Sequence, residues 1–405
     1  MAICVDEALE LILKNIQKVS CEIVPIENAQ SRVSAENISA KYSLPPFNNS
    51  AMDGYAIKLE DSGKKVKVID TIFAGSKKQT LFKSQESIKI MTGARVPDSA
   101  EAIVPHELVE VVDDTHIILP QNIKNQQHIR FVGEDIQKDD TILNDGDEIN
   151  FATITMLASQ GITHIKVYRQ PKVSVFTSGE ELKLHYETVK EYQIYNSNTP
   201  TLLARAKELG ADVTFVGMAK DSVESLKEMI NNSLYSDFII TSGGVSVGDA
   251  DFTQEAFDSF DMDIIFNGIA IKPGKPTIFG KIHNTYILNL PGNPLAASLI
   301  FEMFGKIILQ KLTGNKNIYH KPLYTKMKTT LQNKKGRITL IPGFFDGEFF
   351  EASQKRSPGM VGVLHNCNSI LVLDKDTEIV EKNSSIKILP INWKFFTNSH
   401  KNFVN

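Results

Sequence analysis

The stretch Phe238-Ile-Ile-Thr-Ser-Gly-Gly-Val-Ser-Val-Gly-Asp-Ala-Asp251 joins a short apolar run to a loop of glycine and hydroxyl residues. A short apolar run bounded by turn residues is typical of a buried strand. Backbone N–H groups in a glycine-rich turn can converge on an anion. The loop has no GK[ST] and the chain has no GxGxxG, so the stretch predicts a phosphate or other oxyanion site without naming a standard nucleotide fold.

Strand and helix patterns alternate around this stretch. Residues 172–176 and 213–218 are predicted strands, and residues 201–209 and 222–234 are predicted helices. Such alternation predicts parallel strands with crossover helices on both faces of the sheet. Ligands of sheets of this kind bind beyond the carboxyl ends of the strands.

Two further predicted strands end in unusual loops. Thr177-Ser-Gly-Glu-Glu181 follows the first strand, and Pro291-Gly-Asn-Pro294 follows a strand at 286–290 and begins a helix predicted to run through Leu312. Each loop alone could be a tight connection between strand and helix. Three such loops at neighbouring strand ends favour an anion site.

The segment Ile271-Lys-Pro-Gly-Lys-Pro276 presents two lysines just before the strand that leads to Pro291. Proline lowers the ordering cost of presenting two ammonium groups to one anion. The alternative is a solvated basic turn. The position of the segment beside the predicted anion loops favours anion binding.

Several carboxylates are also candidate site residues. Hard oxygen ligands beside a phosphate favour Mg²⁺, whereas an acid with a raised pKa could donate a proton. The acids concerned are Asp53, Asp135, Glu181, Asp221, Asp249 and Asp251.

The remaining segments predict further subdomains. Residues 5–16 have apolar positions at helical spacing, with Asp6 at or near the N-cap. Short β-rich runs between 41 and 136 predict an all-β module. Residues 151–161 return to helical spacing and are expected to pack on the first helix, which would make the β module an insertion. Short strands after about Tyr319 predict a small C-terminal β domain.

Composition narrows the class of protein. The chain has 405 residues, of which 42% are hydrophobic and 23% charged, as in ordinary globular proteins. A net charge of -4 argues against a general nucleic-acid binder. Cys4, Cys21 and Cys367 are scattered, which predicts a reducing compartment without a disulfide framework or zinc site. With no signal-peptide pattern and no apolar run long enough to span a membrane, a cytoplasmic location is expected.

A second loop-rich stretch, Pro45-Pro-Phe-Asn-Asn-Ser-Ala-Met-Asp-Gly-Tyr-Ala56, lies in the β module. The two prolines block helix entry, and the residues after them form turns and caps. A well-capped connector would explain this composition. Loops on rigid scaffolds also carry binding and catalysis, and Asp53 beside Gly54 suits such a role.

Together these motifs resemble the molybdopterin molybdenumtransferase family, called MoeA in bacteria, to which the E domain of gephyrin belongs. They occur in the family's order and cover most of the chain. The motifs that carry the resemblance are residues 45–56, Ile90-Met-Thr-Gly-Ala94, Gly133-Glu-Asp-Ile136, Thr177-Ser-Gly-Glu-Glu-Leu182, Ser242-Gly-Gly-Val-Ser-Val-Gly248, Lys272-Pro-Gly-Lys-Pro276 and Leu290-Pro-Gly-Asn-Pro294.

The resemblance implies a multidomain α/β fold with four subdomains. They are a discontinuous helical subdomain (1–40 and 137–168), an inserted β subdomain (41–136), a three-layer α/β molybdopterin-binding subdomain (169–317) and a C-terminal β barrel (318–405). It also implies a homodimer, in which the active cleft forms between the α/β subdomain of one chain and the β module of the other.

The implied reaction inserts molybdenum from molybdate into adenylylated molybdopterin and releases AMP, with Mg²⁺ as the metal. The implied catalytic positions are Asp53, Thr92, Asp135, Glu181 and Lys272. The implied substrate-binding positions are Asp221, Ser242, Gly243, Gly244, Ser246, Gly248, Lys275, Pro291, Gly292, Asn293, Pro294 and Arg337. Glu181 and Asp251 are the implied metal ligands.

These residue types suit the implied chemistry. Molybdate is a dianion, which Lys272, Lys275 and backbone donors can hold against a phosphate-rich substrate. Replacing its oxo groups by sulfur requires protons, which Asp53 or Asp135 could supply.

The chain departs from the family pattern at three places. Asn48 stands where the family commonly has Asp, and Gly268 stands where some members carry lysine. Gly362 and Val363 replace serines often found in the C-terminal contribution to the site. None of these departures removes a central acid.

Two alternatives remain beside the transferase. A non-catalytic scaffold of the same fold would not need Asp53, Asp135, Glu181 and Lys272 together, so their joint presence favours the enzyme. The adenylyltransferase that shares the α/β subdomain would lack the β insertion and the C-terminal domain. The substrate is therefore expected from a separate molybdopterin adenylyltransferase.

Overall fold

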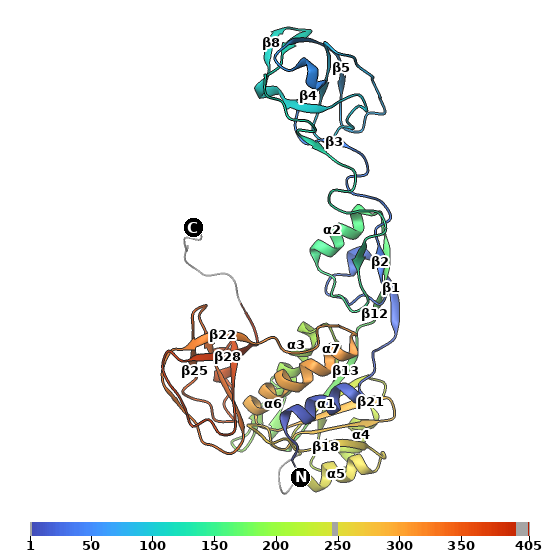
Figure 1. The fold of residues 1–405 in the computed structure, drawn as a ribbon. Helices are drawn as coiled ribbons and strands as arrows, with labels where there is room; N and C mark the ends of the chain where they lie inside the picture. Colours follow the sequence, from blue (N-terminus) through green and yellow to red (C-terminus); the bar gives the residue numbers. More distant parts are fainter. Residues whose placement is uncertain (1, 245–249, 394–403, 405) are drawn as a thin grey trace. The chain divides into compact units, whose positions relative to one another are not determined.

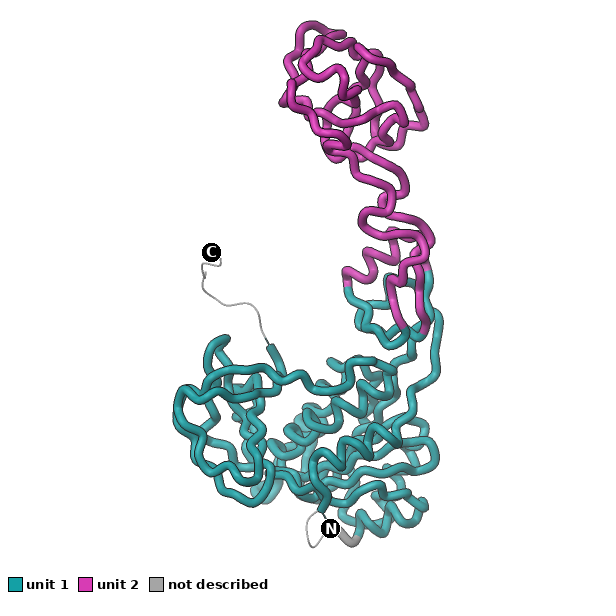
Figure 2. The backbone as a smooth tube through the Cα atoms, viewed as in Figure 1, with its two compact units in different colours: residues 1–35, 145–150, 164–405 teal, residues 36–144, 151–163 magenta. Residues whose placement is uncertain are grey.

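The computed structural model describes residues 2–244, 250–393 and 404. The chain forms two compact units (Figure 2). Unit 1 comprises Met1–Ala35, Asp145–Asn150 and His164–Asn405, and unit 2 comprises Glu36–Asn144 and Phe151–Thr163. The predicted boundaries of the four subdomains stay a prediction. Within the described ranges, the helices are too short or too polar to cross a bilayer.

Unit 1 is built on a mixed six-stranded sheet in the order β16-β13-β17-β21-β20-β18. Figure 1 labels β13, β21 and β18 of this sheet. Its four parallel strands are β13 (Lys172–Ser178), β16 (Asp212–Ala219), β17 (Phe238–Ser242) and β21 (Thr285–Leu290). At one edge, β20 (Ile278–Ile282) runs antiparallel to β21, and β18 (Asp263–Asn267) runs antiparallel to β20. The predicted parallel sheet is therefore confirmed for the strands that carry the anion loops.

Helices cover both faces of this sheet. Alternate strand residues such as Val173 and Val175 are buried in one cluster with Leu202 of α3 (Asn198–Glu208). Phe176, on the other face, is buried with residues of α4 (Val223–Asn231) and α5 (Ala250–Asp258). This period-two alternation confirms the predicted three-layer α/β arrangement.

The helix that follows β21 runs from Pro294 to Leu312 as predicted. It consists of α6 (Pro294–Ile300), a π-helical turn at Phe301–Gly305 and α7 (Lys306–Leu312). Asn293 is its N-cap and Pro294 occupies the first helical position, where a missing N–H costs no hydrogen bond.

The N-terminal helix α1 (Val5–Asn15) packs in the α/β core. Val5, Ala8 and Ile12 are buried in the same cluster as Phe304. The helix α2 (Phe151–Ser159) belongs to unit 2. The two helices belong to different units, so the expected packing of residues 151–161 on the first helix stays a prediction.

The C-terminal strands close into the predicted β barrel. Its core contains Met327, Phe350 and Ile388, which are wholly buried. The ring is closed because β24 pairs with both β25 and β26. In order around the ring, the strands are β24 (Ile338–Phe345), β25 (Phe349–Ala352), β22 (Leu323–Met327), β28 (Ser385–Pro390) and β26 (Ser369–Leu373).

Unit 2 contains its own six-stranded sheet, in the order β7-β4-β6-β5-β9-β8. One face buries Ile72, Ile88 and Ile90, and the other buries Tyr55 and Val104. This sheet accounts for the all-β texture predicted between residues 41 and 136. Its strands are β4 (Gly54–Ile57), β5 (Lys65–Ile72), β6 (Glu86–Ile90), β7 (Ala102–Pro105), β8 (Glu110–Asp113) and β9 (His116–Ile118).

Candidate active site

A cavity of about 730 Å³ lies where β13, β17 and β21 of unit 1 end. The polar side chains and loops predicted at these strand ends meet on its wall. The predicted residues that line it are Glu181, Asp221, Ser242, Gly243, Gly244, Pro291, Gly292, Asn293 and Pro294.

Strand register explains why the three loops meet. Thr177 of β13 pairs with Ser242 of β17, and Ser242 pairs with Leu290 of β21. The three strands are parallel, so their loops begin at the same level of the sheet. The Gly243 N–H donates to Leu290 O at 3.2 Å, which holds two of the loops against each other.

Gly243 is required by close packing between two of these loops. Its φ is +107°, and an added Cβ would lie 2.6 Å from the carbonyl oxygen of Ser178. Only glycine adopts this backbone conformation readily and leaves room for Ser178. The glycine-rich loop therefore brings its backbone close to the end of the neighbouring strand.

Two carboxylates lie on the same cavity. The backbone N–H of Glu180 donates to Asp221 Oδ2 at 3.2 Å, which ties the loop after β13 to the segment after β16. The Glu181 carboxylate lies over Gly179, with its Oε2 2.7 Å from where a Cβ at residue 179 would stand. Both acids are exposed to solvent and available to a ligand.

Three predicted cationic residues gather near the barrel. The strand β19 (Ile271–Lys272) pairs in parallel with β24, and Lys272 stands opposite Thr339. Arg337 precedes Thr339 by two residues, and Lys275 follows Lys272 by three. All three cations are exposed.

The remaining predicted catalytic residues lie in unit 2. Both the backbone N–H and the hydroxyl of Thr92 donate to Asp53 Oδ1, at 2.6 and 2.7 Å. These bonds lower the pKa of Asp53. Asp53 is therefore a carboxylate at neutral pH, which favours proton acceptance over the proton donation considered above. Asp135 is exposed, and its backbone N–H donates to Leu44 O.

Four predicted residues lie wholly or partly outside the described part of the chain. Ser246, Gly248 and Asp249 lie outside the described residues. The backbone of Asp251 lies in α5, but its side chain is also outside the description. Their assignments stay predictions.

The family departures have local structural accounts. Asn48 Oδ1 accepts from the Val132 N–H at 2.9 Å, a contact that an aspartate oxygen could also make. Gly268 has a φ of +96°, which disfavours a lysine there. Val363 is buried in the main core of unit 1, where a serine would lose apolar packing.

Sequence reasoning missed several residues that line the cavity. Tyr195 precedes α3 and Asn198 is the first residue of α3, whereas Gly359 and Val361 come from the barrel domain. The available signal was Asn196-Ser-Asn-Thr199, whose residues are typical of helix N-termini. That signal predicts a helix start but does not predict that Asn198 reaches a cavity.

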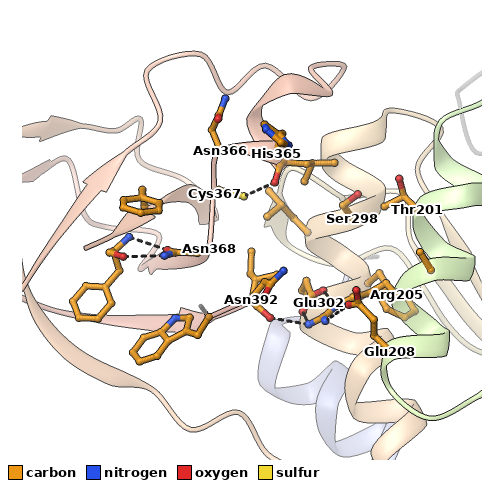
Figure 3. A pocket seen from close by; sticks show the side chains of 18 of the residues that line it. Thr201, Arg205, Glu208, Ser298, Glu302, His365, Asn366, Cys367, Asn368 and Asn392 are labelled. Carbon is orange, nitrogen blue, oxygen red and sulfur yellow. Dashed lines mark hydrogen bonds and ion pairs between the residues drawn. The ribbon is translucent and has the colours of Figure 1, made fainter. Parts of the chain in front are cut away.

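A second, larger cavity of about 1190 Å³ lies between α3, the helix at 294–312 and the barrel domain (Figure 3). None of its lining residues is a predicted site residue. Its walls include Arg205 and Glu302, which form an ion pair, and Cys367. Burial raises the pKa of the Cys367 thiol to about 11, so this group is not a nucleophile at neutral pH.

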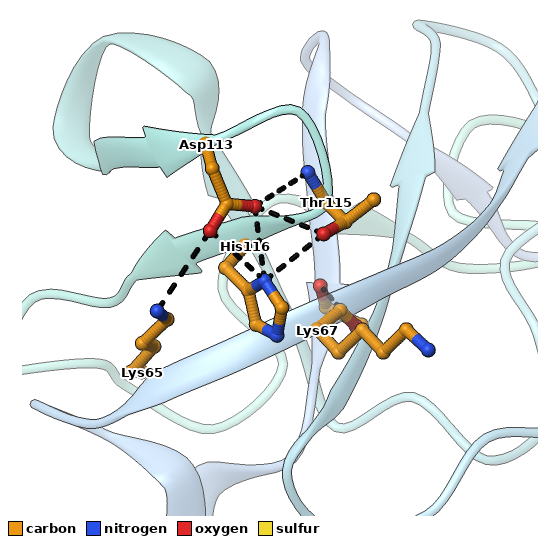
Figure 4. Close-up of polar contacts among 6 residues, drawn as sticks. Lys65, Lys67, Asp113, Thr115 and His116 are labelled. Carbon is orange, nitrogen blue, oxygen red and sulfur yellow. Dashed lines mark hydrogen bonds and ion pairs between the residues drawn. The ribbon is translucent and has the colours of Figure 1, made fainter.

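A polar cluster on the β8–β9 hairpin of unit 2 resembles a catalytic relay only superficially (Figure 4). His116 Nδ1 lies 2.9 Å from Asp113 Oδ1 and 3.0 Å from Thr115 Oγ1. In a hydroxyl–imidazole–carboxylate relay these two partners contact opposite ring nitrogens. Here both contact the same nitrogen, so the cluster stabilises the turn.

The chain matches known proteins over nearly its whole length. Residues 3–161 match the MoeA N-terminal region (domain I and II), and residues 174–311 match a probable molybdopterin binding domain. A molybdopterin molybdenumtransferase from Haemophilus influenzae is 34% identical over 400 residues, which cover 96% of this chain and 98% of that protein. A protein of the same name from Staphylococcus epidermidis is 35% identical over 325 residues, with 78% and 77% covered.

A solved structure agrees with these matches. The molybdopterin biosynthesis MoeA protein from Pyrococcus horikoshii OT3 superposes with a TM-score of 0.84 at 26% identity, covering 96% of this chain and 100% of that chain. The fold, the loops gathered at the strand ends and the sequence relatives lead to one conclusion: this chain belongs to the molybdopterin molybdenumtransferase (MoeA) family.

Proposed function

We propose that this protein inserts molybdenum from molybdate into adenylylated molybdopterin and releases AMP. The observation that carries the proposal is the meeting of three strand-end loops and two carboxylates, Glu181 and Asp221, on one cavity. Relatives that match 96% and 78% of the chain are named for this activity.

The loops suit the phosphate-rich part of this substrate. The Gly243 N–H already donates to Leu290 O, so in this glycine-rich turn the Gly244 N–H is the backbone donor proposed for a phosphate oxygen. The exposed cations Lys272, Lys275 and Arg337 would hold the molybdate dianion through charge-assisted hydrogen bonds.

Mg²⁺ is compatible with the donor set. Among the described side chains, no three His, Cys, Asp or Glu residues form a ready metal site. Mg²⁺ is commonly bound by one or two carboxylates together with substrate phosphates, and the cavity offers Glu181 and Asp221. We include the predicted ligand Asp251 with Glu181 in this proposal. When bound, the ion would offset charge on the pyrophosphate as AMP leaves.

We further propose that the protein acts as a homodimer in the cytoplasm and receives its substrate from a separate adenylyltransferase. In the dimer, Asp53 and Thr92 of one copy would complete the cavity of the other. Mixing Asp53→Asn and Glu181→Gln proteins tests this arrangement. If each site draws on two chains, a mixed dimer has one intact site and recovers activity that neither variant has alone. Unrecovered activity in a verified mixed dimer would contradict the shared site.

The reaction itself has a direct test. Purified protein is incubated with adenylylated molybdopterin, molybdate and Mg²⁺, and AMP release is followed together with reconstitution of an apo-molybdoenzyme. Omitting molybdate, or chelating Mg²⁺ and then restoring it, tests the two inorganic requirements separately. A folded protein that yields neither AMP nor reconstitution would refute the transferase and support the scaffold alternative.

A further inference from the structure

We propose that Asn198 is a positioning residue of this site, whose side-chain amide fastens the loop after β17 to the loop after β21. The inference rests on the proposed function, because the two loops are taken to bind the adenylylated substrate. It assigns a role to a residue that the family motifs left unassigned.

One atom of Asn198 connects the last residue of β17, where the first loop begins, with the loop after β21. Its Nδ2 donates to Ser242 Oγ at 2.8 Å and to the carbonyl oxygen of Gly292 at 2.7 Å. Ser242 Oγ in turn donates to Pro291 O at 3.0 Å. The three bonds form a closed set of contacts around the two loops that line the cavity.

The donor pattern selects asparagine. The only hydrogen of the Ser242 hydroxyl is used toward Pro291 O, so Ser242 must accept from residue 198. Gly292 O is a carbonyl and can only accept. Residue 198 must therefore supply two donors, which one amide nitrogen does and a carboxylate does not.

Asn198 is itself held in a fixed place. It is the first residue of α3, and Asn196, two residues before it, is buried. Asn196 Nδ2 donates to Thr177 Oγ1 at 3.0 Å and to Thr199 Oγ1 at 2.9 Å. Asn196 Oδ1 accepts from the Thr199 N–H at 3.1 Å. The start of α3 is thus tied to the end of β13, and Asn198 extends that connection to the other two strand ends.

The consequence is a specific kinetic signature. Loosening the two loops would weaken binding of adenylylated molybdopterin, whereas the groups that act on molybdate remain in place. Removing both bonds in Asn198→Ala is expected to raise KM for this substrate about tenfold, with kcat within about twofold of wild type. Asn198→Asp is expected to bind more weakly still, because its carboxylate faces Gly292 O and adds negative charge beside the phosphate loops.

The matched control is Thr201→Ala. Thr201 lies on the same helix, and its hydroxyl donates to Ser197 O at 2.9 Å without lining this cavity. Melting temperature, KM and kcat are measured for wild type, Asn198→Ala, Asn198→Asp and Thr201→Ala. Calorimetry gives the dissociation constant of each protein for adenylylated molybdopterin. The dissociation constant is expected to rise from wild type to Asn198→Ala and again to Asn198→Asp. Thr201→Ala is expected to keep the wild-type dissociation constant.

The inference is overturned if wild type turns over substrate while Asn198→Ala keeps the wild-type KM and dissociation constant. It is also overturned if the variant loses kcat and melting temperature together at unchanged KM, since that pattern indicates a purely structural role. A wild-type protein that binds the substrate but releases no AMP contradicts the proposed function, and the order of dissociation constants then still decides the role of Asn198.

Discussion

Thr92 holds a single carboxylate oxygen of Asp53 through two hydrogen bonds, one from its backbone N–H and one from its hydroxyl. The backbone bond is the main cause of the lowered pKa of Asp53, and the hydroxyl bond adds to it. Two residues predicted separately from their motifs thus form one unit. The carboxylate is charged and fixed in orientation before any ligand arrives.

Asp53→Asn tests whether that charge is used in catalysis. The amide keeps an oxygen that can accept both bonds from Thr92, so the fold of unit 2 is expected to persist. If Asp53 takes part in proton transfer, AMP release should fall about 10²-fold or more while the melting temperature stays unchanged. Asp98→Asn, at another exposed acid of the same unit, is the control. Full activity in Asp53→Asn would remove Asp53 from the mechanism.

Thr92→Val tests how the orientation is kept. The substitution removes the hydroxyl bond and leaves the backbone bond, so the pKa of Asp53 should rise part of the way toward its ordinary value of 3.8. Thr92→Ser keeps a hydroxyl at the same place and should restore the wild-type pKa. An NMR titration of the Asp53 carboxyl carbon measures both. Equal pKa values in wild type and Thr92→Val would contradict the contribution of the hydroxyl.

Gly243→Ala tests the close packing of the anion loops. Gly210 serves as the control, because it also has a positive φ (+84°) but an added Cβ would meet no atom within 4 Å. Gly210→Ala is expected to lower the free energy of unfolding by about 1 kcal/mol through backbone strain alone. Gly243→Ala adds a clash with Ser178 and should lose roughly 2 kcal/mol or more. Urea unfolding that gives equal losses would show that the loops yield to the added methyl group.

The sequence predicted the site best where characteristic loop residues follow parallel strands. Glycine and hydroxyl residues after Thr241 and the turn at Pro291 predicted adjacent loops, because parallel strands in register end at one edge of the sheet. Lys272 was predicted as a cation near the site. Its pairing with Thr339, which brings it close to Arg337, required the structure because it joins segments more than sixty residues apart.

Long-range packing limited the rest of the prediction. The apolar spacing of α1 predicted a buried face, but the partner of that face was decided by the shape of the α/β core. The role of Asn198 could not be predicted from the sequence for a similar reason, since an asparagine at the start of a helix normally caps the helix. Its amide instead donates to Ser242 and Gly292, which lie 44 and 94 residues further along the chain.

Asp70 is expected to make the unfolding free energy of unit 2 depend on pH in the acidic range. Its carboxylate accepts from Lys78, Thr80 and the Thr71 N–H, and these bonds lower its pKa from 3.8 to about 2. A group with a depressed pKa stabilises the folded state above its unfolded value and loses that effect as pH falls through the folded value. The difference in unfolding free energy between wild type and Asp70→Asn should be constant above pH 5 and shrink between about pH 4 and pH 2.

Urea midpoints measured at several pH values provide this comparison, and the signal from unit 2 is followed. Asp98→Asn, at an exposed acid of the same unit, is measured in parallel. A difference for Asp70→Asn that is independent of pH would contradict the role given to its ionised form.

The ion pair between Arg205 and Glu302 is expected to contribute more to stability than that between Arg205 and Glu208. Arg205 Nε and Nη2 donate to the two carboxylate oxygens of Glu302 at 2.5 and 3.1 Å, and the Glu302 side chain is only 10% exposed. Glu208 contacts the same guanidinium but is 58% exposed. Removing a buried partner leaves a charge unpaired in a poorly solvated place, so Glu302→Ala should lower the unfolding free energy by about 3 kcal/mol. Glu208→Ala should lower it by less than about 1 kcal/mol. Urea unfolding of the two variants measures both losses, and equal losses would mean that solvent reaches Glu302 as freely as Glu208.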